Sequence, residues 1–209
     1  AQDNSNYKVK LFPQGLHFLP FKANYQEARV GILFYTSNSN LKLDVGNNID
    51  LVRFEFLESK STLSLSLEFM GYALSTSYRG KRFQIAALDG FFGGNIAFSK
   101  KYQKGRLISR FRIIHNSAHL VDGQYDRYLK KWINDDEPIP FTRDFGELTI
   151  GYQFYTNLGT VRAYGTTAYS ALVRPDNLKR WSGYFGFEAA TDKIIETTFG
   201  AKTNLFIAS

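Results

Sequence analysis

The side chains best suited to chemistry lie in one short segment near the middle of the chain. Three of them occupy alternate positions: His115, Ser117 and His119. In a strand, alternate side chains face the same side, so an imidazole can serve as general base for a hydroxyl two positions away. The acid that orients the imidazole is expected among three later carboxylates: Asp122, Asp126 and, more remotely, Glu147. One hypothesis is therefore a catalytic set of His115, Ser117 and Asp122.

A second interpretation of the same segment involves no catalysis, and it is the one we favour. Here the two histidines and Ser117 are interfacial polar residues that hydrogen-bond loop backbone or lipid headgroups. A metal site is not expected, because rings four positions apart in a strand are separated by roughly 13 Å. The acidic run at 135–137 lacks the spacing of an oxygen-ligand loop. We predict no metal and no cofactor.

The arginines in this strand indicate which face points outward. Arg106, Arg110 and Arg112 share the face opposite to the histidines. A charge that faces lipid costs about 2 to 4 kcal/mol at the bilayer midplane, so the arginines are expected in a wet lumen. His115, Ser117 and His119 are then expected on the lipid-facing surface.

The rest of the chain shows the same period-two alternation. The predicted strands are 29–36, 41–57, 62–76, 83–99, 106–120, 144–157, 160–173, 181–190 and 195–208. Several reach the roughly 9 to 11 residues that a membrane-spanning strand requires. The sequence predicts an all-β fold, a single antiparallel transmembrane β-barrel of about 8–12 strands over 29–209. Residues 1–28 are expected to form an N-terminal plug or the first strand. A soluble β-barrel or sandwich is the alternative.

Charge and composition narrow the expected partners. The chain has a net charge of +7 and no cysteine, which excludes disulfides, thiolate metal sites and a cysteine nucleophile. The positive charge is concentrated in connections and lacks a nucleic-acid-binding motif, so nucleic acid is not an expected partner. Headgroup contacts are predicted for His119, Lys130, Lys131 and Trp132, with membrane lipid or lipopolysaccharide as partner. The polar N-terminus is interpreted as the end left by removal of a signal peptide.

The His115-Asn116-Ser117 string resembles the His-x-Ser motif of two outer-membrane lipid hydrolases, lipid A deacylase and outer-membrane phospholipase A. This resemblance implies a catalytic His and Ser on the outer surface of a barrel, next to a lipid substrate. Ala118 departs from the motif, where both families have Asn. No acid is assigned by the motif.

A longer part of the chain resembles an uncharacterised bacterial envelope family, domain of unknown function 1207. The similar segments are 12–20 with 27–29, 87–94, and 115–123 (HNSAHLVDG), where Val121 and Gly123 depart from the pattern. The resemblance covers roughly residues 12–125. It implies an outer-membrane barrel and no activity.

Together these observations favour a non-enzymatic bacterial outer-membrane barrel. It would serve as a structural element, a narrow pore or a subunit of an envelope assembly with other envelope proteins. In such a small barrel, inward arginines should meet inward glutamates and close the interior. The side chains expected there are Arg53, Arg106, Arg110, Arg112 and Arg162 with Glu55, Glu68 and Glu188. The alternatives are a lipid esterase or deacylase using the His-x-Ser pair, and a soluble β-barrel binding module.

Overall fold

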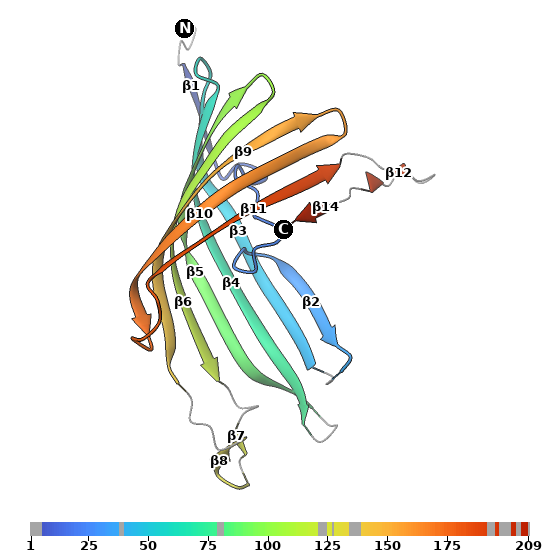
Figure 1. Cartoon of the computed structure of the whole chain (residues 1–209), viewed down its shortest axis with the longest axis vertical. Helices are drawn as coiled ribbons and strands as arrows, with labels where there is room; N and C mark the ends of the chain where they lie inside the picture. The colour runs from blue at the N-terminus through green and yellow to red at the C-terminus, as the bar shows by residue number, and fades with distance from the viewer. Residues whose placement is uncertain are drawn as a thin grey trace.

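The fold is all-β, as predicted, and consists of one large antiparallel sheet with two small hairpins. The structure, a computed structural model, describes residues 6–37, 40–78, 82–120, 125–126, 128–133, 139–191, 195–196, 202–203 and 206–208. Within these ranges, no helix has the length and apolar character needed to cross a membrane. Figure 1 shows the large sheet as a strongly curved wall with a concave and a convex face.

In the part of the chain that the structure describes, the large sheet contains ten strands. They are β1 (Tyr7–Leu11), β2 (Val30–Tyr35), β3 (Asn40–Phe56), β4 (Ser61–Tyr78), β5 (Arg82–Tyr102), β6 (Gly105–Leu120), β9 (Phe141–Thr156), β10 (Gly159–Arg174), β11 (Trp181–Thr191) and β14 (Phe206–Ala208). Their order is β1-β3-β4-β5-β6-β9-β10-β11-β14, with β2 also paired to β3. The two hairpins are β7 (Tyr125–Asp126) with β8 (Lys131–Trp132), and β12 (Ile195–Glu196) with β13 (Lys202–Thr203).

The central strands follow the predicted ranges because each alternates polar and apolar side chains along its whole length. They are joined by short turns at one end of the sheet, the upper end in Figure 1: 57–60, 103–104 and 157–158. The turn before β10 requires glycine at Gly159, whose φ is +142° and whose added Cβ would lie 2.0 Å from the Ala190 carbonyl oxygen. The longer connections lie at the other end, which we call the long-loop end.

One edge of the sheet is shared by two strands from the N-terminal part of the chain. β1 pairs with the second half of β3, and β2 pairs with the first half. Between them, residues 12–29 leave the sheet and lie on its concave side; we call them the inner segment. This excursion does not appear in the hydrophobic alternation, because the inner segment contains no strand.

The other edge is formed by β11 and β14, which pair only over Glu188–Ala190. Among the described residues, no pairing joins this edge to β1 or β2, so closure into a barrel is not observed. The prediction of one strand over 195–208 was wrong. Its described residues form three short strands, and β12 and β13 pair with each other, which requires the chain to reverse between them.

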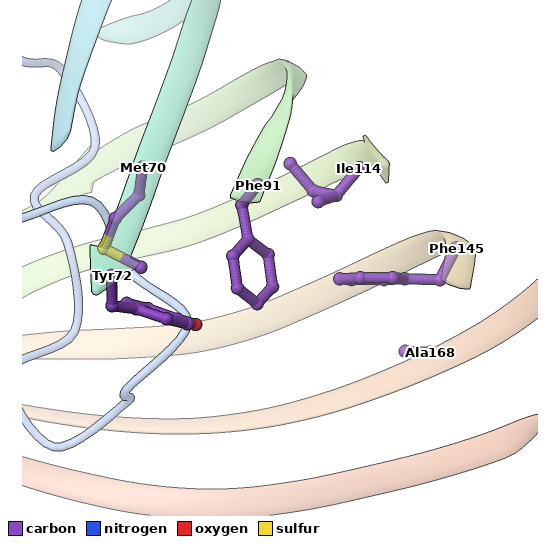
Figure 2. Close-up of a cluster of buried hydrophobic side chains, with 6 residues drawn as sticks. All are labelled: Met70, Tyr72, Phe91, Ile114, Phe145 and Ala168. Atoms are coloured by element: carbon purple, nitrogen blue, oxygen red, sulfur yellow. The ribbon is translucent and has the colours of Figure 1, made fainter. Parts of the chain in front are cut away.

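The core lies on the concave face in two clusters of apolar side chains. Figure 2 shows the first, contributed by neighbouring strands from β4 to β10: Met70, Tyr72, Phe91, Ile114, Phe145 and Ala168. The second brings Phe18 and Phe21 of the inner segment against Ala97, Ile108 and Tyr164. The rings of Phe21 and Tyr164 stack with their centroids 3.7 Å apart. The inner segment is therefore packed into the sheet.

Candidate functional site

The two faces of β6 carry opposite kinds of side chain. Arg110 and Arg112 are each 1% exposed and lie on the concave face. Phe111 lies between the two arginines in the sequence and Ile113 follows them, and both of these apolar side chains are exposed on the convex face. Arg106 also lies on the concave side, where its Nε donates to Gln153 Oε1 at 3.1 Å. The three arginines therefore share a face, as alternation along a strand requires.

The buried arginines on β6 form a charged network with three glutamates. Arg110 forms a two-pronged ion pair with Glu27 of the inner segment, and both side chains are almost fully buried. Arg112 donates from Nε to Glu147 Oε1 at 2.7 Å and lies 3.5 Å from Glu68 Oε2. A guanidinium can fork onto a carboxylate in this way because both groups are planar. The network joins the inner segment to β4, β6 and β9.

A second ion pair holds the other part of the inner segment. Arg162 on β10 binds Glu188 on β11, and its guanidinium also donates to the carbonyl oxygens of Leu19 at 2.7 Å and Pro20 at 3.2 Å. The Lys22 backbone N–H donates to Glu188 Oε1 at 2.5 Å. The arginine heads also lie over aromatic rings: Arg110 is 4.5 Å from the centroid of Phe18, and Arg162 is 4.5 Å from that of Phe21. These contacts fix both the backbone and the rings of the inner segment.

His17 fixes the start of the inner segment. Its Nδ1 lies 2.9 Å from Ser64 Oγ and its Nε2 lies 2.7 Å from Ser99 Oγ, while its backbone N–H donates to Asp50 Oδ2 at 2.8 Å. Burial, together with the positive charges of Arg106 and Arg53, lowers the pKa of His17 to about 4. The neutral ring is therefore the form that this position holds.

Some of these ion-pair partners were predictable from the sequence and others were not. The pairs of Arg112 with Glu68 and of Arg162 with Glu188 join side chains that were expected to meet. Arg53 instead lies 2.5 Å from Asp50, and Glu55 pairs with Lys10. Glu27 was missed because it lies in the inner segment, 83 positions from Arg110. No local pattern marks such a contact.

On the convex face, His115 is paired with a carboxylate that was not predicted. Its Nδ1 lies 2.5 Å from Asp144 Oδ1, and the two side chains are 36% and 43% exposed. Asp144 lies directly opposite His115 in the register of β6 and β9. The ring of Phe92 packs beside the imidazole, with centroids 4.8 Å apart. The contact to Nδ1 leaves Nε2 as the ring nitrogen that can accept a proton.

Ser117 shares this convex face two positions further along β6. Its cross-strand neighbours are Gly90 on β5 and Thr142 on β9. A Cβ added at Gly90 would meet no atom within 4 Å, so the surface beside Ser117 is open. Within the described part of the chain, the Ser117 hydroxyl has no hydrogen bond, including none to His115. The imidazole and the hydroxyl are thus on one face without being joined.

The acids proposed from the sequence lie elsewhere. Asp122 is outside the described residues. Asp126 accepts hydrogen bonds from the backbone N–H groups of Tyr128 and Leu129 in the β7–β8 hairpin. Glu147 faces the concave side and binds Arg112, because it lies an odd number of residues from Asp144 on β9. The prediction that Asp126 or Glu147 orients His115 was therefore wrong.

The residues predicted to touch headgroups lie at the long-loop end. His119 is exposed near the end of β6, and Lys130 and Lys131 are exposed in the β7–β8 hairpin. Trp132 packs against Tyr125 across that hairpin, with ring centroids 5.3 Å apart. Its aromatic surface is thus partly used within the hairpin.

Comparisons with known proteins add no family to these observations. No protein-family model, curated protein or solved structure matches the chain. The resemblances to the envelope family and to the two lipid hydrolases therefore stay predictions. What the chain does must be inferred from the two faces of its sheet.

Proposed function

We propose that this protein is a non-enzymatic outer-membrane β-barrel protein whose interior is occupied in large part by its own inner segment. One observation carries the proposal: the open convex face of the large sheet is lined by large apolar side chains, whereas its buried concave face holds paired charges beside two apolar clusters. The exposed face of a soluble antiparallel sheet is mainly polar, and large exposed apolar patches mark contact with another apolar phase. Membrane lipid is the partner that covers a curved sheet on its whole outer side.

The convex face supports a continuous lipid-facing band. Large apolar side chains are exposed on seven neighbouring strands: Ile49 on β3, Leu65, Leu67 and Phe69 on β4, Phe92 and Ile96 on β5, Phe111 and Ile113 on β6, Leu148 and Ile150 on β9, Val161 on β10, and Phe185 and Phe187 on β11. Burying each such side chain contributes about 1.5 to 3 kcal/mol. A face of this size exposed to water would promote aggregation, whereas in a bilayer it stabilises insertion.

Aromatic pairs at the two ends of the strands support this placement. At the short-turn end, Tyr102 lies beside Tyr152 with centroids 6.3 Å apart, and Lys100 lies 6.0 Å from the Tyr102 ring. Near the long-loop end, Tyr169 and Trp181 are 5.0 Å apart. Amphipathic rings favour both headgroup regions of a bilayer.

The concave face supports a closed interior. The inner segment is held by Arg110 and Arg162 through ion pairs, carbonyl contacts and ring contacts, and by His17 through two serines. A small barrel has little space beyond its own side chains, and here a further segment occupies it. The role that follows is a sealed structural element of the envelope, alone or in an assembly, not a diffusion pore.

Reconstitution of the full chain into phospholipid vesicles and planar bilayers tests this proposal. We expect the protein to remain with the vesicles after alkaline carbonate washing and to give no large steady conductance. Extraction without detergent would contradict membrane insertion and would favour the soluble binding module. Retention with a large steady conductance would contradict the sealed interior alone.

A second candidate function is lipid ester hydrolysis at the convex face, and the His115–Asp144 contact is the observation that favours it. A carboxylate at Nδ1 fixes the imidazole and stabilises its protonated form, which is how a general base is prepared. The open surface beside Ser117 leaves room for an ester carbonyl. A substrate would approach from the lipid phase, which favours phospholipid or the acyl esters of lipopolysaccharide.

In this reaction Ser117 would be the nucleophile, His115 the general base and acid, and Asp144 the residue that orients the imidazole. Ser117 Oγ attacks the ester carbonyl carbon while its proton passes to His115 Nε2, with Asp144 stabilising the imidazolium. The imidazolium then protonates the departing alcohol, and an acyl group stays on Ser117. Water, deprotonated by the same imidazole, releases the fatty acid. Because no hydrogen bond joins His115 to Ser117, substrate binding must bring the two groups together, as occurs when catalytic contacts tighten in the complex.

Ester release from mixed micelles of phospholipid or lipopolysaccharide tests the hydrolase directly. If the site is catalytic, Ser117→Ala should lower the rate to background and Asp144→Asn should lower it by about a thousandfold or more. Ser109→Ala is the matched control, because Ser109 lies on the same convex face of β6. No activity in the wild-type protein, or equal activity in the wild-type and Ser117→Ala proteins, would contradict this candidate and leave the structural role in place.

A further inference from the structure

The concave side contains a cavity that the inner segment does not fill. Its volume is about 330 Å³, within the range of small-molecule sites. Residues 23–26 of the inner segment form one wall, and β9, β10 and β11 form the others. Phe145, Tyr164, Ala168 and Tyr184 supply most of the apolar lining. Figure 2 shows Phe145 and Ala168 at one end of the first core cluster, with Phe145 projecting from its strand toward the interior.

Arg143 supplies a cation to this cavity, and none of the acidic side chains that the structure describes pairs with it. Its Nε donates to Ser170 Oγ at 2.5 Å and one Nη donates to Ser182 Oγ at 3.2 Å. Among the described residues, no carboxylate lies within ion-pair distance of this guanidinium. Arg110, Arg112 and Arg162, on the same concave face, each have a glutamate. Within the described part of the chain, the positive charge of Arg143 at the cavity is therefore not balanced by a carboxylate.

The guanidinium is also held in place. The two serine hydroxyls come from β10 and β11, and the ring of Phe145 lies 5.5 Å from the guanidinium carbon. These contacts leave the second Nη with its donors unused in the described structure. A fixed guanidinium with free N–H groups is suited to a planar carboxylate, which accepts paired hydrogen bonds.

The carboxylate of Glu147, in the cavity wall, does not neutralise the positive charge of Arg143. Glu147 also lines the cavity, but its two carboxylate oxygens accept from Arg112 at 2.7 and 3.2 Å. A second arginine, Arg110, also approaches this carboxylate, with its Nη2 3.7 Å from Glu147 Oε1. The charge of Glu147 is thus balanced by two arginines. The Tyr184 hydroxyl donates to Glu147 Oε2 at 3.4 Å and accepts from Asn24 Nδ2 at 2.8 Å, so both groups are neutral polar partners at the cavity.

We propose that this cavity binds a small organic acid. Its carboxylate pairs with Arg143, and its apolar body lies against Phe145, Tyr164 and Tyr184. An aromatic or short aliphatic acid meets both requirements, because the site is small, is lined by several aromatic rings and has a positive charge at one point. The residues that hold the acid lie on the concave side, so the site does not depend on whether the convex face contacts lipid.

Fluorine NMR of the purified full chain in nanodiscs tests the proposal with two matched probes. The probes are 4-fluorobenzoate and 4-fluorobenzyl alcohol, which share an apolar body and differ in charge; empty nanodiscs correct for partition into lipid. We expect the acid to bind at least about tenfold more tightly than the alcohol, as a charged hydrogen-bonded contact implies.

Three variants assign the binding to the cavity. Arg143→Gln should reduce the acid to the affinity of the alcohol, and Ala168→Phe, which fills the cavity while Arg143 is kept, should abolish both. Lys179→Gln removes an exposed charge and should change neither. No binding of the acid to the wild-type protein would overturn the proposal. So would unchanged acid binding in Ala168→Phe, which keeps the test decisive even if Arg143→Gln fails to fold.

Discussion

The convex and concave faces of this sheet are made by the same strands yet follow opposite rules. On β6, Arg110 is 1% exposed and Ile113, three positions later, is 63% exposed. On β9, Glu147 faces inward and binds Arg112, whereas Asp144 faces outward and binds His115. The buried charges are paired by forked contacts, while the outer pair stays half-exposed. The buried face of the sheet thus holds paired charges together with the apolar core, whereas the exposed face presents large apolar side chains.

The largest effect is expected from breaking the buried network at the inner segment. Glu27→Ala leaves the Arg110 guanidinium buried beside one remaining, more distant carboxylate, and loss of one partner of a buried pair costs about 3 to 5 kcal/mol. Urea unfolding in detergent measures the change in free energy. Replacing both partners, as Glu27→Leu with Arg110→Met, should recover most of the loss because no buried charge is left unpaired.

An exposed ion pair provides the control for that experiment. Lys10 and Glu55 lie 2.7 Å apart near the short-turn end, with Lys10 half-exposed. Lys10→Ala should cost no more than about 1 kcal/mol, as is usual for surface pairs. If Glu27→Ala proved equally mild, the inner segment would not be held by the concave network.

A charge introduced on the convex face should lower the free energy of unfolding nearly as much as the Glu27→Ala change does. Ile113→Lys places an ammonium in the middle of the apolar band, which in a bilayer costs about 2 to 4 kcal/mol. In water the same change at so exposed a position would cost less than about 0.5 kcal/mol. Unfolding in phospholipid vesicles distinguishes the two. Leu158→Lys, in an exposed short turn, is the control and should have little effect in either medium.

A smaller, pH-dependent effect is expected at His17. Its pKa is about 4 in the folded protein and close to 6.5 when the inner segment is released. The folded state therefore binds the proton less readily. The contribution of His17 to the free energy of unfolding is therefore complete above pH 6.5, and it declines as the pH falls toward 4. Urea midpoints at pH 7.5, 6 and 5 measure this decline.

His17→Gln shows how much of that decline belongs to the histidine. The variant should lose stability at pH 7.5, because Gln cannot bridge Ser64 and Ser99 as the ring does. Over the same pH interval it should decline less than the wild-type protein. Parallel curves for the two proteins would show that other groups cause the pH dependence.

The alternation of polar and apolar residues made the central strands predictable, because the type of each side chain there indicates the face of the sheet on which it lies. The β3–β6 and β9–β11 ranges follow from this local signal, and so does the shared face of Arg110 and Arg112. The path of the inner segment was not predictable in the same way. Its contacts join Glu27 to Arg110 and Leu19 to Arg162, across 83 and 143 positions.

The site at His115 on the convex face was also only partly predictable from the sequence. His115 and Ser117 were placed on one face by their spacing alone. Asp144 was missed because its position beside His115 depends on the register between β6 and β9, which the 20 residues of the intervening connection separate in the sequence. The cavity at Arg143 was missed for a related reason, since its walls come from four separate parts of the chain.

The central claim, that lipid covers the convex face and not the concave one, is tested most directly by two adjacent residues of β5. Phe91 is 6% exposed on the concave face and Phe92 is 59% exposed on the convex face. Single tryptophans would be introduced as Phe91→Trp and Phe92→Trp, with Trp132 and Trp181 replaced by Phe, in vesicles of brominated phospholipid. The account predicts strong quenching for Phe92→Trp and little for Phe91→Trp. Equal quenching, or none at either position, would contradict it.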